Sequence, residues 1–580
     1  LSRRLSNMGD MLHDFGVNKL EKLRRSRFDF NMRQTHDQRQ GALVPLCWHM
    51  VTPSEVWSCK AHSFNRLLLT LAKPLFADVY FTYGFYFVPL RILFKDYEKM
   101  FGDGSPQEWI NPTEYVIPSM RFLARNSSVS AKAVGAGYDA VVPDSVSVDA
   151  SGNLISFPGN LANYLGLPAT QTGNALYKEV NPAPFLAYER IWTDMYRDEN
   201  YQNEDPDLSK YKALNPGTAG VRTNITFGLH YANRFHDYFS SLLPNTQKGP
   251  SANAFSHLIT LPDLYTFEYL PGDDATDANP VWFGDASKNK FQNSVLELDG
   301  SGNLVAPSPS SISSTRQVLS TNLGVDISVE KLRMAFATQR ARERNARAGS
   351  RFVEAMLGTF EAHLSNGIAQ RAEFLGGNTI KLNITSVPST SENSPGKLGA
   401  FSATRDDSNV FIKQFNEPGI VMAVGTYRIK HRYSQGVDRQ FDKLRRYDFY
   451  DPAFAHVSEQ PHTAWELAPI NNLGADTVIG FNEPWVEDLK PVDRVCGQMG
   501  NPSASLDFKA WVPVDNFASN ASPNPAAWLP ENGDDIAKRC IDYDSDYPTW
   551  VFGTDFIAEC KVTSPRPIYS IPGFIDHLIG

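Results

Sequence analysis

Arginines recur at a spacing that places them on one side of a helix expected from Val329 onward. Ser328 can cap this helix, and Glu330 in its first turn complements the positive end of the helix dipole. At 100° per residue the arginines fall within a stripe about 60° wide, although Gly349 can end the helix before the last of them. They are Arg333, Arg340, Arg344, Arg347 and Arg351. Such a stripe suits the phosphates of a nucleic acid, and it suits equally a row of salt bridges to a second copy of the chain.

A second cationic cluster lies near the N-terminus, where Arg24, Arg25 and Arg27 precede Phe28. Cations beside aromatic rings suit a phosphate backbone with stacked bases, and docking on another subunit suits them equally well. Residues 1–40 contain nine basic and five acidic residues and only a weakly apolar helical pattern. We therefore expect residues 1–40 to form a basic N-terminal arm that needs a neighbour to lie on.

The third basic segment, residues 428–447, contains seven basic and two acidic residues and includes Arg445 and Arg446. The whole chain has a net charge of −9, so the rest of the molecule is strongly acidic. Basic patches on an acidic protein indicate one surface for a polyanion and another for solvent. Charge alone nevertheless favours the simpler interpretation, in which each basic run is a solvated or subunit-pairing surface.

Residue patterns typical of catalysis or metal binding are weak. Asp542, Asp544 and Asp546 imitate the start of a calcium-binding loop, but Tyr547 occupies the position that requires glycine, so only a calcium site of another kind stays open. A lone pair such as His456 with Glu459 is more typical of a satisfied interior contact than of a metal site. No phosphate-binding loop, nucleophile elbow or zinc-protease motif is present. We expect no catalytic residue, no bound metal and no cofactor.

The five cysteines show no C-x-x-C spacing, which predicts free thiols in a reducing cytoplasm. The first sixteen residues carry charge but no apolar core, so we expect no secretory signal. The apolar run over residues 80–88 is bracketed by Asp78 and Arg91. It is well short of the roughly 18 residues that a membrane-spanning helix needs.

The elements that must position these residues are mainly strands. Residues 80–88 are almost all aromatic or apolar, which predicts a strand covered on both faces and ended by Pro89. Alternating apolar positions predict half-buried strands at residues 380–385 and 556–562. Further strands are expected at residues 42–51, 56–60 and 419–433, and a helix at residues 184–200. This order predicts a mainly β fold, an antiparallel sandwich with large helical and loop insertions.

Two polar, aperiodic stretches interrupt the pattern. Residues 121–180 are rich in Ser, Gly, Ala and Asn, which predicts a surface connection. Residues 251–322 are rich in Asp, Ser, Asn, Gly and Pro, and their length predicts an insertion on an exposed surface.

Seven sequence blocks, in one order along the chain, resemble the major capsid protein of the Microviridae, the small single-stranded DNA phages, and most closely its gokushovirus branch. They are residues 27–29 (RFD), 79–102 (VYFTYGFYFVPLRILFKDYEKMFG), 184–200 (PFLAYERIWTDMYRDEN), 236–250 (HDYFSSLLPNTQKGP), 346–377, 435–460 and 566–578. Leu90 stands where the family usually has asparagine, and Ala372 and Ser458 replace a proline and a glycine. The chain is therefore identified as a divergent member.

The resemblance implies a viral jelly roll, an eight-stranded antiparallel β-sandwich or barrel, as a single capsid domain over residues 41–580. It implies self-assembly into a T=1 icosahedral shell that packages circular single-stranded DNA, with no enzymatic activity. The inward arginines and Phe28 would then contact the genome, and residues 251–322 would form an outer protrusion that meets a host receptor.

Further partners implied by the resemblance are small DNA-binding proteins and pilot or vertex proteins of the virion, with assembly in the bacterial cytoplasm. Two alternatives stay open at this point. Tyrosine and tryptophan richness with scattered carboxylates also suits a β-sandwich glycoside hydrolase, and a carbohydrate-binding jelly-roll module is the other.

Overall fold

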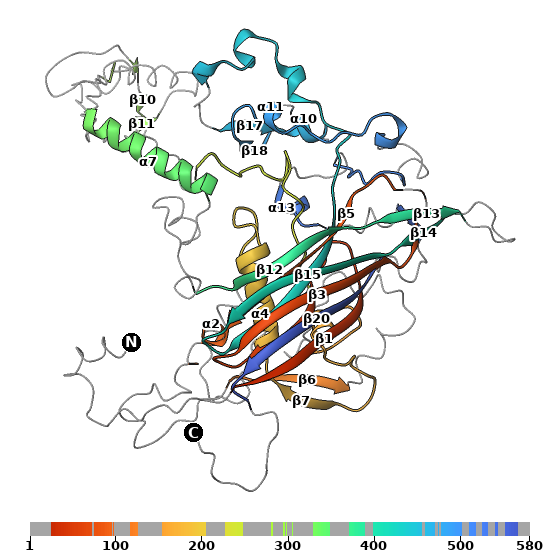
Figure 1. The fold of residues 1–580 in the computed structure, drawn as a ribbon. Coiled ribbons are helices and arrows are strands. Elements are labelled where there is room, and N and C mark those ends of the chain that lie inside the picture. The colour runs from red at the N-terminus through yellow and green to blue at the C-terminus, as the bar shows by residue number, and fades with distance from the viewer. Residues whose placement is uncertain are drawn as a thin grey trace, which may run out of the picture. The chain divides into compact units, whose positions relative to one another are not determined.

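The fold is seen in a computed structural model of the chain (Figure 1). The structure describes residues 25–71, 73, 75–94, 97, 117–125, 153–204, 227–247, 280–281, 294–295, 297–298, 304–305, 329–348, 370–388, 398–454, 459–469, 474, 477–501, 510–517, 525–531, 540–542 and 551–566. It divides into two compact units. One unit is Leu1–Thr246 with His363–Gly580, and the other is Gln247–Ala362.

Eight long strands of the larger unit form two four-stranded sheets in which every neighbouring pair is antiparallel. The first sheet has the order β1 (Ser26–Gln38), β20 (Phe552–Ser564), β3 (Val56–Leu67) and β15 (Thr404–Gln414). The second has the order β12 (Glu373–Lys381), β5 (Val79–Pro89), β16 (Gly419–Ile429) and β2 (Val44–Val51). Because the chain passes repeatedly between the sheets, the topology is that of a jelly roll, which confirms the predicted fold class.

The central strands of the second sheet, β5 and β16, are buried on both faces along most of their length, which explains the aromatic density of β5. Its odd-numbered rings, Phe81 to Phe87, pack between the two sheets, whereas Tyr86 and Val88 pack on the opposite face. β16 is divided in the same way, with Val421 facing the first sheet and Met422 facing away. Where both faces are buried no polar side chain can reach water, so residues 83–88 of β5 and 420–424 of β16 form continuous apolar runs.

The first sheet has one face on the core and one face in solvent. Along β20 the buried residues Phe556, Ala558, Cys560 and Val562 alternate with less buried ones, as predicted from their period of two. The two sheets are also joined by a buried polar contact. The hydroxyl of Tyr427 on β16 donates to Asn65 Oδ1 on β3 at 2.8 Å and lies 2.6 Å from Thr554 Oγ1 on β20.

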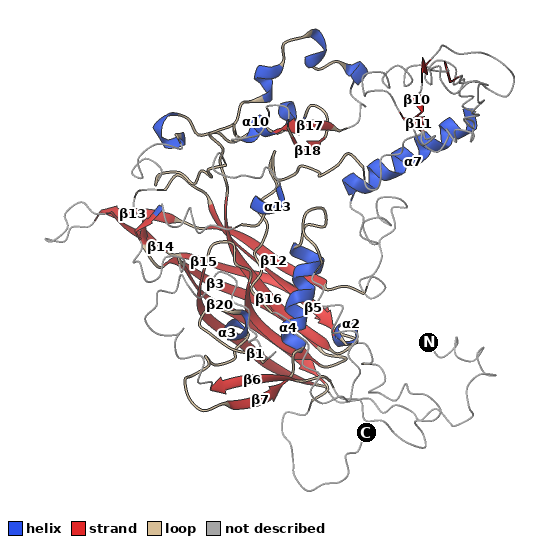
Figure 2. Cartoon of the chain, turned by 180° about the vertical axis from the view of Figure 1, so that it is seen from behind, coloured by secondary structure: helices blue, strands red, loops and turns tan. Residues whose placement is uncertain are grey.

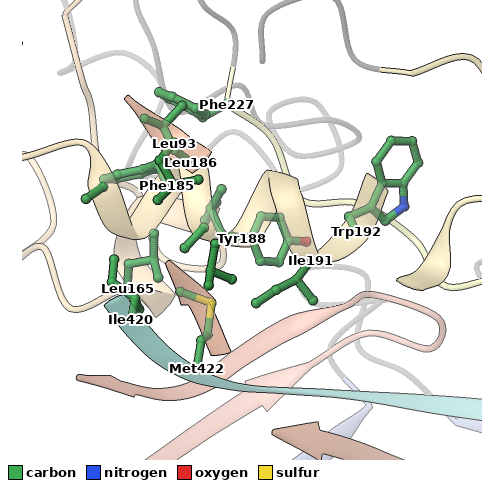
Figure 3. Packing of buried hydrophobic residues seen from close by; sticks show 14 of the residues in the cluster. Leu93, Leu165, Phe185, Leu186, Tyr188, Ile191, Trp192, Phe227, Ile420 and Met422 are labelled. Carbon is green, nitrogen blue, oxygen red and sulfur yellow. The ribbon is translucent and has the colours of Figure 1, made fainter. Parts of the chain in front are cut away.

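Helices cover the outer face of the second sheet (Figures 2 and 3). Pro182 precedes α4 (Ala183–Ile191), which continues into the π-helical turn η6 (Trp192–Tyr196) and confirms the helix predicted over residues 184–200. Tyr188 fixes this helix, since its hydroxyl donates to the carbonyl of Leu43 at 2.8 Å and accepts from the backbone N–H of His230 at 3.0 Å. Two shorter helices, α2 (Leu90–Leu93) and α3 (Leu161–Tyr164), join the same apolar cluster.

Two expected boundaries differ from the structure. Ser26–Gln38, expected in the arm, is an edge strand of the sandwich, because Phe28, Phe30 and Met32 alternate with polar residues and complete its core. The stretch expected as a surface connection contains β6 (Met120–Arg125) and β7 (Leu176–Val180), which pair with each other. Phe122, Leu154 and Leu161 in this stretch are buried against the helical face of the second sheet, so its described part belongs to the core.

The described residues within 233–247 and 431–531 form a region that we call the loop lobe. It contains β17 (Gln460–Thr463), α10 (Ala464–Leu467), β18 (Val478–Asn482), α11 (Val486–Leu489), α13 (Pro525–Trp528) and the 3₁₀-helices η8 (Arg439–Asp442), η9 (Arg446–Asp448), η10 (Pro452–Phe454) and η11 (Gly497–Gly500). The lobe has its own small apolar core around Phe239, Tyr433 and Phe517.

The remaining described elements are short. Two short antiparallel pairs lie in the larger unit, namely β4 (Thr70–Leu71) with β19 (Ile541–Asp542), and β13 (Ile384–Pro388) with β14 (Leu398–Ser402). The smaller unit contains the pairs β8 (Pro280–Val281) with β9 (Ser294–Val295) and β10 (Glu297–Leu298) with β11 (Leu304–Val305), and the helix α7 (Val329–Ala348). The helix predicted from Val329 is therefore confirmed.

Candidate nucleic-acid and subunit interface

The N-terminal cationic cluster leads into β1. Arg25 and Arg27 are exposed, whereas Phe28 is half-buried on the opposite face of the strand. Successive side chains of a strand point to opposite faces, so a base stacked on Phe28 would not lie beside the Arg27 guanidinium. Arg24 lies outside the described residues.

The arginine stripe lies on α7 in the smaller unit. Arg333, Arg340 and Arg344 are exposed, as are the apolar side chains of Met334 and Phe336. Arg347 belongs to the helix, but its side chain is not described. Gly349 and Arg351 lie outside the described residues. A helix with exposed cations and exposed apolar side chains suits an interface rather than a purely solvated face.

The third cationic pair lies on residues 437–454, which we call the aromatic loop. Arg445 and Arg446 are exposed there, and the guanidinium of Arg446 lies 5.7 Å from the ring centre of Tyr447. Leu444 is 85% exposed and Phe441 is 75% exposed. The other large apolar side chains exposed on this loop are Val437, Tyr447, Phe449, Tyr450 and Phe454. So many large apolar groups in water within one short segment indicate a surface that another molecule covers.

The aromatic loop is held in a defined shape although it has few buried residues. The carboxylate of Asp448 accepts the backbone N–H groups of Leu444 at 3.0 Å and Arg445 at 2.6 Å. Asp438 caps the 3₁₀-helix η8 in a similar way, by accepting from the N–H of Gln440. These hydrogen bonds satisfy backbone N–H groups that a short helix cannot satisfy itself. The exposed aromatic side chains of the loop are therefore attached to an ordered backbone.

Four other cations of segment 428–447, namely Arg428, Lys430, Arg439 and Lys443, have partners inside the molecule. Lys443 forms ion pairs with Glu487 at 3.3 Å and Asp488 at 3.2 Å, and Arg439 lies 3.5 Å from Glu466. Arg428 is largely enclosed, with its guanidinium 4.0 Å from the ring centre of Phe235, and burial lowers its pKa. Within the part of the chain that the structure describes, Arg445 and Arg446 have no ion-pair partner. They are also exposed, which leaves them available to a polyanion.

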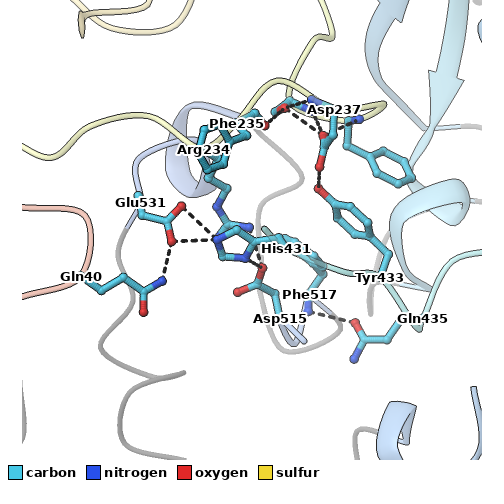
Figure 4. Close-up of polar contacts among 12 residues, drawn as sticks. Gln40, Arg234, Phe235, Asp237, His431, Tyr433, Gln435, Asp515, Phe517 and Glu531 are labelled. Atoms are coloured by element: carbon cyan, nitrogen blue, oxygen red, sulfur yellow. Dashed lines mark hydrogen bonds and ion pairs between the residues drawn. The ribbon is translucent and has the colours of Figure 1, made fainter. Parts of the chain in front are cut away.

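A buried ionic network lies in the loop lobe and is hydrogen-bonded to the sandwich through Gln40 (Figure 4). His431 lies between two carboxylates, with Nδ1 2.8 Å from Asp515 and Nε2 2.9 Å from Glu531. Arg234 pairs with Asp515 at 2.6 Å, and Gln40 donates to Glu531 at 2.5 Å. The network thus contains one arginine, one histidine and two carboxylates, and its charges balance when His431 is protonated.

The pKa values of this network follow from its geometry. Burial disfavours the imidazolium, but attraction from Glu531 and Asp515 outweighs it and raises the pKa of His431 to about 9. Burial also opposes ionisation of Asp515 and Glu531, yet Arg234 and His431 lower the pKa of both carboxyl groups. Sequence reasoning missed this network, because its members come from segments that no local spacing connects.

The structure gives no support to the calcium-loop aspartates or to the pair of His456 and Glu459 as metal or acid–base sites. Asp542 lies in β19, paired with Thr70, while Asp544, Asp546 and His456 lie outside the described residues. Glu459 is buried in the loop lobe. Among the described residues, no group of three or more His, Cys, Asp or Glu side chains could hold a metal ion. The helices within the described ranges include none long and apolar enough to cross a membrane.

A jelly roll with an ordered, exposed aromatic loop is the architecture of a protein that assembles through its surface. A sequence model of the family described as capsid protein (F protein) matches residues 19–574, and the chain belongs to this family. It is a structural capsid protein of a bacteriophage and not an enzyme, and the glycoside hydrolase and carbohydrate-binding alternatives are not favoured.

Three relatives support this assignment along nearly the whole chain. Capsid protein VP1 of Spiroplasma virus 4 is 28% identical over 99% of this chain and 99% of its own length. Capsid protein VP1 of Chlamydia phage 1 is 28% identical over 95% of this chain and 96% of its own length. Capsid protein VP1 of Bdellovibrio phage phiMH2K is 25% identical over 94% of this chain and 95% of its own length. The resemblance to gokushovirus capsid proteins is thereby confirmed, and the chain's place is in the virion.

Proposed function

We propose that copies of this chain assemble into a T=1 icosahedral shell around a circular single-stranded DNA genome. The observation that carries the proposal is the aromatic loop, which exposes Leu444 and Phe441 almost completely although the sandwich beside it has complete cores on both sides of its second sheet. Covering these side chains with a second copy removes apolar area from water, at about 25 cal/mol per Å². Self-association is therefore favourable at this loop.

For the genome, the supporting feature is the pair Arg445 and Arg446 beside exposed rings. Guanidinium groups bind phosphates, and exposed rings stack with unpaired bases without sequence preference. Further contacts of the same kind are proposed at Arg24, Arg25, Arg27, Phe28, Arg333, Arg340, Arg344, Arg347 and Arg351. A shell that holds its DNA in this way releases it at high salt.

The remaining partners are proposals as well. Residues 251–322 would form a protrusion on the outer surface that meets a host receptor, and small DNA-binding and pilot or vertex proteins would complete the virion. Assembly would take place in the bacterial cytoplasm, where all five cysteines can persist as the free thiols that the structure has.

Expression of the full chain and sedimentation of the purified protein test the proposal. We expect large particles with icosahedral symmetry in electron micrographs, and nuclease-resistant single-stranded DNA in particles recovered from infected cells. A chain that remains a stable monomer at high concentration, or particles that protect double-stranded DNA or none, would contradict it.

A further inference from the structure

Two buried cysteines face each other across neighbouring strands of the first sheet. The register of β3 and β20 places Cys59 directly opposite Cys560, although 501 positions separate them in the sequence. Directly opposed residues of antiparallel strands have Cα atoms about 4.5 to 5.5 Å apart. That separation falls inside the range of about 4.4 to 6.8 Å found for disulfides, so the backbone already suits a covalent bond.

The side chains are oriented toward each other as well. The two Sγ atoms lie 2.6 Å apart, as free thiols, and both side chains are buried between the sheets. Cys47 of the second sheet belongs to the same apolar cluster, whereas Cys496 is exposed. Five cysteines without a spacing motif gave no indication of this pair, because only the strand register creates it.

We propose that Cys59 and Cys560 are a modification site, at which a peroxide converts the two thiols to a disulfide that joins β3 to β20. In the first step one thiol, as its thiolate, attacks hydrogen peroxide and breaks the O–O bond, giving a sulfenic acid and one water. In the second step the other thiol attacks the sulfenic sulfur, the S–S bond forms, and a second water leaves. Two thiols are oxidised and one peroxide is reduced, so atoms and electrons balance.

The surroundings of the pair make this oxidation slow in the folded protein. The hydrogen bond with Cys560 and burial both raise the pKa of the Cys59 thiol, and burial raises the pKa of Cys47. The reactive thiolate is therefore scarce at neutral pH, and peroxide must enter a closed core. We expect a slow reaction that accelerates as the pH rises, and this distinguishes the pair from a fast redox sensor.

The bond would stabilise one particular part of the fold. β20 is the last long strand of the sandwich and lies between β1 and β3. A bond to β3 would close a loop of about five hundred residues and would restrict the unfolded chain strongly. Independently of whether shells form, the oxidised protein should therefore unfold at a higher temperature than the reduced protein.

The test uses the full chain, incubated with dilute hydrogen peroxide at pH 7 and pH 9, then unfolded in N-ethylmaleimide, digested and analysed by mass spectrometry. We expect a linked Cys59–Cys560 peptide that forms faster at pH 9 and disappears on reduction. We also expect a rise in Tm of about 5 °C that dithiothreitol reverses. Cys496→Ala is the matched control and should form the same linked peptide, whereas Cys59→Ala should form none.

Other outcomes would overturn the proposal. Peptides of Cys59 and Cys560 that remain alkylated after prolonged oxidation would exclude the bond, as would sulfinic acid at either residue without a linked peptide. A bond from Cys560 to Cys47 would show that the register of β3 and β20 does not select the partner. If Cys59→Ala does not fold, the alkylation pattern of the unsubstituted chain still decides the question.

Discussion

Nε2 of His431 lies 2.9 Å from Oε1 of Glu531, and both side chains are enclosed where the loop lobe joins the sandwich. Glu531 also accepts from Gln40, which lies between β1 and β2. The lobe is therefore attached to the sandwich by this hydrogen bond from Gln40 to the Glu531 carboxylate, and the ion pairs within the lobe keep that carboxylate charged. Since a buried ion pair that loses one partner costs several kcal/mol, this contact makes the junction sensitive to pH and to substitution.

The first prediction is a loss of stability at alkaline pH. The folded-state pKa of His431, about 9, is above its ordinary value of 6.5, so its stabilising contribution is complete below pH 6.5 and disappears as the pH rises through 9. Asp515 and Glu531 act in the opposite sense: their pKa values are lowered, so their contribution disappears in acid. Arg234 also faces the network and keeps its charge throughout.

Thermal unfolding from pH 5 to pH 10 checks this prediction, with His431→Gln as the comparison. At pH 6 the substitution should cost about 3–5 kcal/mol, because Glu531 loses its nearest cation and Arg234 alone must then balance two buried carboxylates. The difference between the two proteins should become smaller as the pH passes 9. A difference that stays constant across this range would contradict the assignment of His431 as the titrating group.

The second prediction concerns Gly41, which has φ +76° at the same junction. A Cβ atom at this position would overlap the backbone carbonyl of Glu531. Gly166 is a matched control, since its φ is +98° but a Cβ atom there meets nothing within 4 Å. Gly166→Ala should cost about 1–2 kcal/mol from the backbone conformation alone, and Gly41→Ala on the order of 3–5 kcal/mol. Equal denaturation midpoints for the two variants would show that the backbone around Glu531 can move to make room for the added methyl group.

The third prediction tests DNA binding by the aromatic loop. The double variant Arg445→Ala/Arg446→Ala should bind a thymidine oligonucleotide more weakly than the unsubstituted chain at low salt. The slope of log affinity against log salt should fall in magnitude by about 0.7 for each phosphate that the protein no longer neutralises. Arg405→Ala is the control, because Arg405 is an exposed arginine of the sandwich that pairs with Asp407. The measurement is fluorescence anisotropy at several salt concentrations. An unchanged slope in the double variant would show that the aromatic loop does not bind DNA.

The fourth prediction tests self-assembly. Leu444→Asp places a charge where we expect a second copy to cover the loop, so particles should no longer form while the Tm of the unassembled chain changes little. Analytical ultracentrifugation measures the first effect and differential scanning calorimetry the second. Normal particles formed by Leu444→Asp would mean that this side chain stays in water in the shell.

The sequence predicted well those features that depend on side chains close together in the chain. The two-sided burial of β5 follows from its unbroken apolar composition, the alternation along β20 from its period of two, and the start of α7 at Val329 from the capping residue before it. The alternation of Phe28, Phe30 and Met32 was equally readable as a strand, but the neighbouring arginines led to the interpretation of an arm. The family resemblance rests on motifs of the same local kind.

By itself, then, the sequence determined the class of fold, the elements that build it and the family to which the chain belongs. Only the tertiary structure decided which residues meet: His431 with Asp515 and Glu531, and Cys59 with Cys560. It also decided which cations of segment 428–447 are paired internally and which, such as Arg445, remain exposed. The physical reason is that the periodicity of apolar residues depends on neighbours a few positions apart in the chain. Strand register and the pairing of buried charges depend instead on contacts between distant segments, which form only when the whole core packs.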